Sequence, residues 1–272
     1  MIKNLKLLLL YLSLFLAFSE AQSLLVNFRL EIWKDTVYIG EPIILKCWLV
    51  NNNDLAVKVW REGPTGLLYI GAIDFYLTSS GRDTSRYAVG IKDFTRQMPS
   101  LDISPRDSIY WYSMLCWNNF ARSEKLLYQA GEYEIIGRYT LIAKDAAADT
   151  LLFFEIISNK NIFFATEIPD SEKAIYNELI PLTREYFWWG ERFDKTWTRK
   201  DYNDLCKRVA DTKSRFAIYA HYIYCKSTGD KNEMQKFLQR YPKGPLSELV
   251  EFMLNPIEAK VKYPLNYFAG KK

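Results

Sequence analysis

The sequence predicts a multi-domain β + α protein, in which an antiparallel β-sandwich over residues 22–158 is followed by an α-helical, repeat-like domain over residues 168–272. In the first region, apolar residues alternate with a period of two, and Gly, Pro, Asn and Asp separate the short runs. After Ile168-Pro169 the period changes to about 3.6, which is typical of amphipathic helices. Residues 159–167 are expected to form an irregular linker between the two domains.

The first 21 residues have the pattern of a secretory signal peptide. Lys3 and Lys6 precede an apolar run from Leu7 to Phe18, and small residues follow at Ser19 and Ala21. An apolar run of about 12 residues is too short for a bilayer core, which needs roughly 20. We therefore expect the mature chain to begin after Ala21, to be exported to the periplasm or extracellular space, and to contain no transmembrane segment.

The charge pattern argues against one class of partner, and the positions of the cysteines argue against one disulfide bond. The chain has 36 basic and 32 acidic residues, a formal net charge of +4, and its basic residues are scattered among acids, so a nucleic acid is not an expected partner. If Cys206 and Cys225 lie on two helices joined near Asp211, they are offset by more than about 10 Å, beyond the reach of a disulfide. We expect two free buried thiols there, and the pairing of Cys47 with Cys116 is left open.

Two stretches define the predicted sandwich. Gly40-Glu41-Pro42 is a turn that leads into a strand from Ile43 to Val50, in which alternate apolar residues face inward. The turn Ala130-Gly131 leads into the strand Glu132–Ile142. Tyr133 begins this second strand, so we expect its ring to be buried and its hydroxyl to bond the backbone a few residues upstream, as in a tyrosine corner.

These stretches resemble the bacterial immunoglobulin-like domains of exported and cell-surface proteins. The resemblance rests on Gly40-Glu41-Pro42, the Asn-rich turn 51–54, the turn 104–108 and the stretch 130–133. It covers about half of the chain and implies an immunoglobulin-like β-sandwich, but it implies almost nothing about function. Antibody domains have a cysteine two residues after the corner tyrosine; because Ile135 stands there, an apolar contact must replace their disulfide.

The last hundred residues predict a series of helices. Pro181 interrupts the first apolar stripe, so this segment is expected to be a kinked helix or two short helices. Gly244-Pro245 opens a helix with a regular apolar stripe. The stretch from Phe237 to Glu248 resembles the helix–turn–helix junction of tetratricopeptide-like repeats, which implies a scaffold or a protein-binding region.

No catalytic, metal or cofactor motif is present in the sequence. The only histidine, His221, lies four residues before Cys225, and a packed histidine beside a buried thiol explains this pair better than a nucleophilic site. Glu132 and Glu134 share the outer face of one strand, where solvated carboxylates are ordinary. We therefore expect no enzyme, no cofactor and no metal.

Aromatic clusters are the remaining candidates for a binding site. They are the stretch Tyr110-Trp111-Tyr112, Trp117 and the stretch Phe187-Trp188-Trp189. Either Phe187 or Trp188 is expected to pack against the sandwich, because Tyr186 and residues 187–189 are four adjacent helical aromatics and cannot all face one core. The side chains predicted as partner-binding candidates are Trp111, Trp117, Phe187 and Trp188.

These observations favour a non-enzymatic exported protein that binds a protein partner or has a structural role in the cell envelope or extracellular space. One alternative is a carbohydrate-binding or adhesive module that uses exposed aromatic residues. A second alternative is a hydrolase whose carboxylate pair leaves no local pattern in the sequence.

Overall fold

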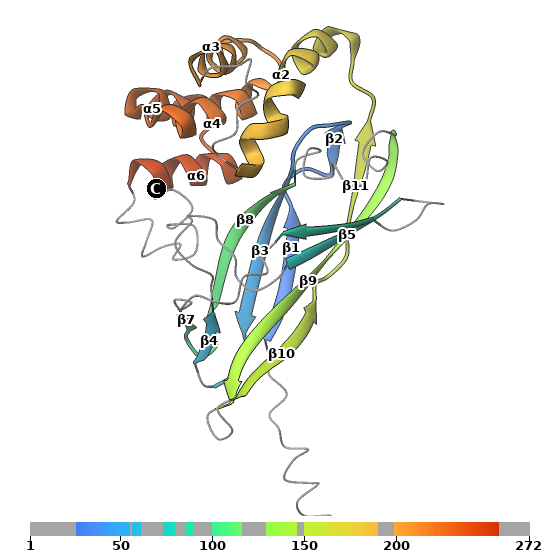
Figure 1. Ribbon diagram of the computed structural model, residues 1–272, viewed down its shortest axis with the longest axis vertical. Coiled ribbons are helices and arrows are strands. Elements are labelled where there is room, and N and C mark those ends of the chain that lie inside the picture. Colours follow the sequence, from blue (N-terminus) through green and yellow to red (C-terminus); the bar gives the residue numbers. More distant parts are fainter. Residues whose placement is uncertain are drawn as a thin grey trace, which may run out of the picture.

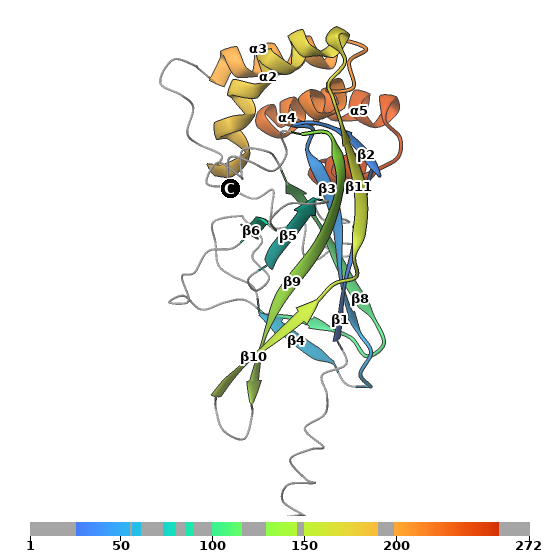
Figure 2. The same ribbon diagram turned by 90° about the vertical axis from the view of Figure 1, so that its right-hand side faces the viewer.

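The computed structural model describes residues 26–54, 56–60, 73–79, 85–89, 100–115, 129–145, 150–189 and 199–255. The strands come first along the chain and the helices last, and the helices gather at one end of the strands (Figures 1 and 2). No helix within these ranges is both long enough and apolar enough to span a membrane.

A three-stranded antiparallel sheet forms one layer, with its strands in the order β1-β3-β8. Its central strand alternates strictly: Leu45, Cys47 and Leu49 are fully buried, whereas the residues between them face the other side of the sheet. The strands are β1 (Val26–Ile32), β3 (Ile43–Asn51) and β8 (Ser108–Leu115).

A six-stranded mixed sheet forms the second layer. Its longest strand, β9, pairs with β5 on one side and with β10 and β11 on the other, and β2 pairs with β11 in parallel. A small third sheet consists of β4 and β7. The strands are β2 (Thr36–Tyr38), β5 (Ile73–Ser79), β6 (Ser85–Val89), β9 (Gly131–Asp145), β10 (Thr150–Ile157), β11 (Asn161–Thr166), β4 (Val57–Trp60) and β7 (Ser100–Ile103).

The two larger sheets bury one apolar core between them, to which β1, β3, β8, β5, β9 and β11 all contribute. Tyr133 lies in this core with 1% of its surface exposed, and its ring stacks on Phe163 at a centroid distance of 5.4 Å. Its hydroxyl donates to the carbonyl oxygen of Gln129 at 2.9 Å. The prediction for this tyrosine is confirmed.

Within the described ranges, five helices follow the strands. Asp230 caps α5 by accepting hydrogen bonds from the backbone N–H groups of Asn232 and Glu233, and Gly229 ends α4 with a positive φ of 68°. Helix α2 contains Pro181 and changes direction along its length (Figure 2), as expected for a kinked helix. The helices are α2 (Asp170–Trp189), α3 (Arg199–Ala210), α4 (Ala217–Thr228), α5 (Lys231–Arg240) and α6 (Pro245–Leu254).

A second core contains side chains from helices and strands together. The buried Ile44 of β3 belongs to the same cluster as Phe237 and Val250 of the helices, and Trp33 and Tyr112 pack against it. The helices therefore cover part of the outer face of the three-stranded sheet.

The predicted fold class, an immunoglobulin-like β-sandwich followed by a helical repeat-like domain, is wrong. The structure is an α/β arrangement of small antiparallel and mixed sheets with five helices, and the strands and helices share one of its two main cores. The parallel pairing of β2 with β11 also departs from an all-antiparallel sandwich. Residues 161–166, placed in the expected linker, form β11, because Phe163 and Ala165 face inward from a segment that is apolar on both faces.

Candidate functional site

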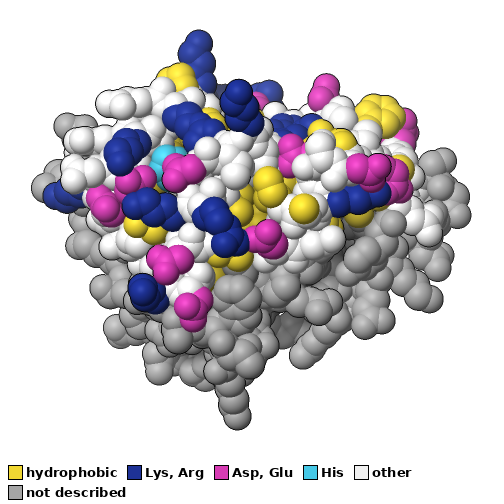
Figure 3. Space-filling view, turned by 90° about the horizontal axis from the view of Figure 1, so that it is seen from above, with side chains coloured by type: hydrophobic (Ala, Val, Ile, Leu, Met, Phe, Trp, Pro, Cys, Tyr) yellow, Lys and Arg dark blue, Asp and Glu magenta, His cyan; other side chains and the backbone are white. Residues whose placement is uncertain are grey.

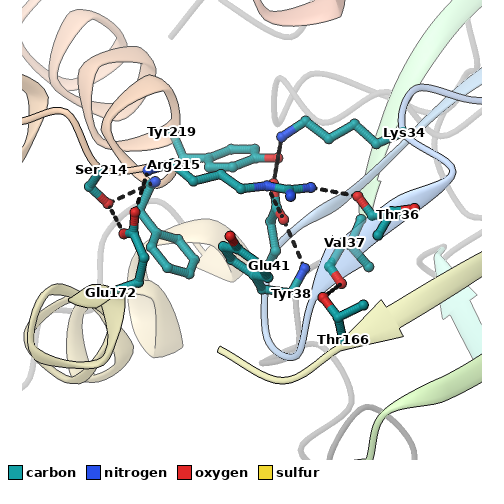
Figure 4. Close-up of polar contacts among 11 residues, drawn as sticks. Lys34, Thr36, Val37, Tyr38, Glu41, Thr166, Glu172, Ser214, Arg215 and Tyr219 are labelled. Carbon is teal, nitrogen blue, oxygen red and sulfur yellow. Dashed lines mark hydrogen bonds and ion pairs between the residues drawn. The ribbon is translucent and has the colours of Figure 1, made fainter. Parts of the chain in front are cut away.

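The carboxylate of Glu41, between β2 and β3, is bonded by four different residues (Figure 4). Gly40 makes this turn possible, since its φ is +81° and a Cβ atom there would lie 2.2 Å from the hydroxyl of Tyr176 on α2. The turn thereby pushes the side chain of Glu41 under the helices, where none of it is exposed.

Two cations and two neutral donors surround this carboxylate. The ammonium of Lys34 lies 2.5 Å from one oxygen, and Nε of Arg215 lies 2.9 Å from the other. The hydroxyl of Tyr219 donates at 2.7 Å, and the backbone N–H of Tyr38 donates at 2.9 Å. Burial lowers the pKa of Lys34, and the nearby negative charge of Glu41 partly opposes this.

The loop before α4 extends these contacts to α2 and β2. The carboxylate of Glu172 accepts hydrogen bonds from the hydroxyl of Ser214 and, at 3.1 Å, from the backbone N–H of Arg215. The guanidinium of Arg215 also donates to the carbonyl oxygen of Thr36. We call Lys34, Glu41, Arg215 and Tyr219 the Glu41 cluster. Because the carboxylate of Glu41 is fully buried and bonded by four donors, the cluster joins strands to helices, and Glu41 itself is not an accessible acid or base.

His221 and Cys225 are both buried on α4. The Nε2 atom of His221 lies 3.5 Å from the carboxylate of Glu233, and burial lowers the pKa of this histidine, with Glu233 partly opposing the effect. Burial raises the pKa of the Cys225 thiol to about 12, so at neutral pH this sulfur is not a thiolate. Cys206 is also buried and free, so the prediction of two unpaired thiols is confirmed.

Three aromatic rings form a row on the outer face of the three-stranded sheet, and we call Trp48, Tyr110 and Tyr112 the aromatic row. Trp111, between the two tyrosines, points into the core, so the tyrosines point outward. Tyr110 lies opposite Trp48 with ring centroids 4.8 Å apart, and it meets Tyr112 edge-on at 5.9 Å.

Charged side chains of both signs surround the aromatic row. The ammonium of Lys46 lies 3.8 Å from the ring centroid of Tyr110 and 4.6 Å from that of Trp48. At one end, the hydroxyl of Tyr110 donates to the carboxylate of Glu248 on α6 at 2.9 Å. Along the neighbouring strand β1, Arg29 and Glu31 lie opposite Trp48 and Lys46 and form an ion pair at 2.8 Å.

Exposed apolar side chains lie on the outer face of the other sheet. Ile157, Ile162 and Phe164, which we call the apolar strip, have 60%, 48% and 47% of their surface exposed. They are the large hydrophobic residues with this degree of exposure in the described ranges. A groove of about 430 Å³ continues from Ile157 along the edge of β1, between Phe28 and Asn159.

The side chains predicted for partner binding lie in different places. Trp111 is in the core, 4% exposed, with its ring parallel to that of Phe28 at 6.1 Å, so it presents no surface to a partner. Trp117 lies outside the described residues. The backbone of Phe187 and Trp188 belongs to α2, but their side chains lie outside the described part, so their predicted packing stays a prediction.

Sequence reasoning missed three of these features for separate reasons. Glu41 was interpreted only as a turn residue, because its partner Arg215 lies 174 residues away. Ile162 and Phe164 were placed in the linker, where their alternation was hidden by the apolar residues between them. The aromatic row was predicted only in part. Tyr110 and Tyr112 were grouped with the buried Trp111, and Trp48 was not included.

Comparisons with known proteins identify no family. No family model matches the chain, and no curated protein matches it. Solved structures with partial similarity include a β-glucosidase from Erythrobacter marinus (13% identity, 49% of this chain and 15% of that chain, TM-score 0.27). Another is the sporulation control protein Spo0M from Bacillus subtilis (12% identity, 58% of this chain and 55% of that chain, TM-score 0.29). A third is a putative late embryogenesis abundant protein (9% identity, 56% of this chain and 79% of that chain, TM-score 0.33). With TM-scores below 0.5, these similarities carry no argument about fold or function.

Proposed function

We propose that this chain is a non-enzymatic exported protein that binds a protein partner in the cell envelope or extracellular space. The apolar strip is the observation that carries this proposal. Soluble proteins seldom leave several large apolar side chains together on one sheet face unless that face is covered by another molecule. Figure 3 shows the helical end of the molecule, where the described basic and acidic side chains are intermixed, and this pattern favours a protein over a nucleic acid.

The geometry of the apolar strip suits a protein interface. Ile162 and Phe164 are two residues apart on β11, so their side chains emerge from the same face about 7 Å apart. Ile157 continues the apolar strip at the end of β10, on the same side of β9. An apolar centre of this kind with a charged rim is the usual anatomy of a protein–protein interface.

The rim consists of ion pairs on the same sheet. Lys160 pairs with Glu134 at 2.6 Å, and Arg138 pairs with Glu155 at 3.5 Å. All four side chains are at least about a third exposed, so these pairs contribute little to folding stability and remain available to orient a partner.

Two buried titratable groups, Glu41 and Cys225, are unsuited to catalysis. The carboxylate of Glu41 has no exposed atom, and the pKa of the Cys225 thiol is raised to about 12. A general base or a nucleophile needs an accessible group with a pKa near the working pH. Neither group meets that requirement.

A capture experiment with matched variants tests this proposal. The chain from residue 22 onward, carrying a photo-crosslinking residue at position 132, an exposed site opposite Phe164, is exposed to envelope and extracellular fractions, and the captured protein is then purified and titrated directly. Phe164→Ser and Ile162→Ser should each weaken its binding by about 30-fold, as expected for a buried apolar anchor. Lys213→Ser, an exposed site on the helical side, serves as the control and should bind like the wild type.

Three outcomes would overturn the proposal. They are the absence of any captured protein, equal binding by the strip variants and the control, and turnover in a broad hydrolase screen of the purified chain. The third outcome would restore the hydrolase alternative.

A further inference from the structure

We propose that the aromatic row is a second binding site, and that its ligand is a neutral saccharide. This inference is independent of the apolar strip, because the two sites lie on the outer faces of different sheets.

The first argument is the rigidity and exposure of the rings. Trp48 and Tyr110 are cross-strand neighbours on paired strands, and each residue of the aromatic row is partly exposed, although the indole Nε1 atom of Trp48 is buried. The hydrogen bond from Tyr110 to Glu248 fixes one ring to α6. Aromatic faces held on strands lose little conformational entropy when they stack against the flat C–H face of a sugar ring.

The second argument is the balance of charge around the rings. Lys46 and Arg29 supply N–H donors, and Glu31 and Glu248 supply carboxylate acceptors, so the four groups have no net charge. A polyhydroxylated ligand bonds to donors and acceptors together, and it carries no charge that these four side chains would have to neutralise. Such a set of groups therefore matches the hydroxyls of a neutral saccharide.

The position of Lys46 disfavours a cationic ligand. Its ammonium already lies over Tyr110 and Trp48, the place that a quaternary ammonium group would take, and the two positive charges would repel. No carboxylate pairs with this ammonium in the part of the chain that the structure describes. Moving it aside costs only about two- to fivefold in affinity for each exposed ring that it leaves, so a stacking sugar can shift it to the edge of the rings, where the ammonium donates to a ligand hydroxyl and is covered by the ligand.

The test titrates the chain with neutral hexasaccharides of glucose, mannose and xylose by calorimetry. At least one should bind the wild type, and Trp48→Leu should weaken that binding by about tenfold. Tyr224→Leu is the matched control, because Tyr224, like Trp48, is a partly buried aromatic residue with a lysine above its ring: the ammonium of Lys207 lies 5.6 Å from the centroid. This control should bind like the wild type.

A second measurement uses the unmodified chain and does not depend on the folding of any variant. Reductive methylation followed by mass spectrometry should label Lys46 more slowly when the bound hexasaccharide is present, whereas the labelling of Lys207 should not change. The proposal is overturned if no hexasaccharide binds, if Tyr224→Leu weakens binding as much as Trp48→Leu does, or if Lys46 is not protected. Phe164→Ser should leave saccharide binding unchanged, so failure at one site is distinguishable from failure at the other.

Discussion

Replacement of Glu41 by glutamine tests whether the Glu41 cluster holds strands and helices together. Glutamine has the same shape and can still accept a hydrogen bond from Tyr38, but it leaves the charges of Lys34 and Arg215 without a counter-charge. Removing one partner from a buried ion pair costs about 3–5 kcal/mol of folding free energy. The side chains of Lys34 and Arg215 keep 24% and 30% of their surface exposed, so water offsets part of the loss. We therefore expect a value at the lower end, about 3 kcal/mol.

Urea denaturation followed by tryptophan fluorescence measures this change. With a denaturant slope of about 3 kcal/mol per molar, the midpoint should fall by about 1 M. Glu178→Gln is the control: Glu178 pairs with Arg208 at the surface, both side chains are at least half exposed, and removing such a pair should cost less than about 1 kcal/mol.

A double variant sharpens the test. Lys34→Met combined with Glu41→Gln should cost clearly less than the sum of the two single changes, since the second change removes a charge that the first left unpaired. Equal midpoints for Glu41→Gln and Glu178→Gln, or strict additivity in the double variant, would refute the reasoning.

Three further predictions concern single side chains. Tyr133→Phe should lower the free energy of unfolding by about 1 kcal/mol through the lost hydrogen bond, and Tyr133→Ala by about 3 kcal/mol or more through the added cavity; wild-type urea midpoints for both would contradict this. The lowered pKa of His221 means that the unfolded chain takes up this proton first, so stability should fall from pH 7 to pH 5, and His221→Gln should flatten that dependence. Cys206 and Cys225 should resist alkylation at pH 8 until urea unfolds the chain, and a bridged peptide in the mass spectrum would show the thiol assignment to be wrong.

The sequence predicted local structure better than assembly. The buried side of β3 follows directly from its alternation, and Leu45, Cys47 and Leu49 are fully buried. The turn before Tyr133 likewise placed that ring and its hydrogen bond correctly. In both cases the pattern that orients the side chains, the alternation along β3 and the turn before Tyr133, lies within a few residues, so it can be read from the sequence.

The way the elements assemble could not be predicted in the same manner. Ile44 lies on the outer face of its strand, where a polar residue is the ordinary expectation, and it is buried only because the helices cover it. The pairing of β2 with β11 joins Val37 to Ala165, and a three-residue strand carries no signal for a partner so distant. The aromatic row likewise depends on the register between β3 and β8, which places Trp48 opposite Tyr110.

The Glu41 cluster can form only late in the synthesis of the chain. Glu41 and Tyr219 are separated by 178 residues, and ribosomes add about 5–20 residues per second, so Glu41 emerges roughly 10 to 35 s before its last partner. Until then, its carboxylate can be neither buried nor neutralised by Arg215. The outward side of β3 at Ile44 stays uncovered for the same period, because the helices that cover it are synthesised last. A nascent or truncated chain that lacks the final third therefore exposes the apolar side chain of Ile44 and the charged carboxylate of Glu41 to solvent. A chaperone that binds this surface would protect the chain from aggregation.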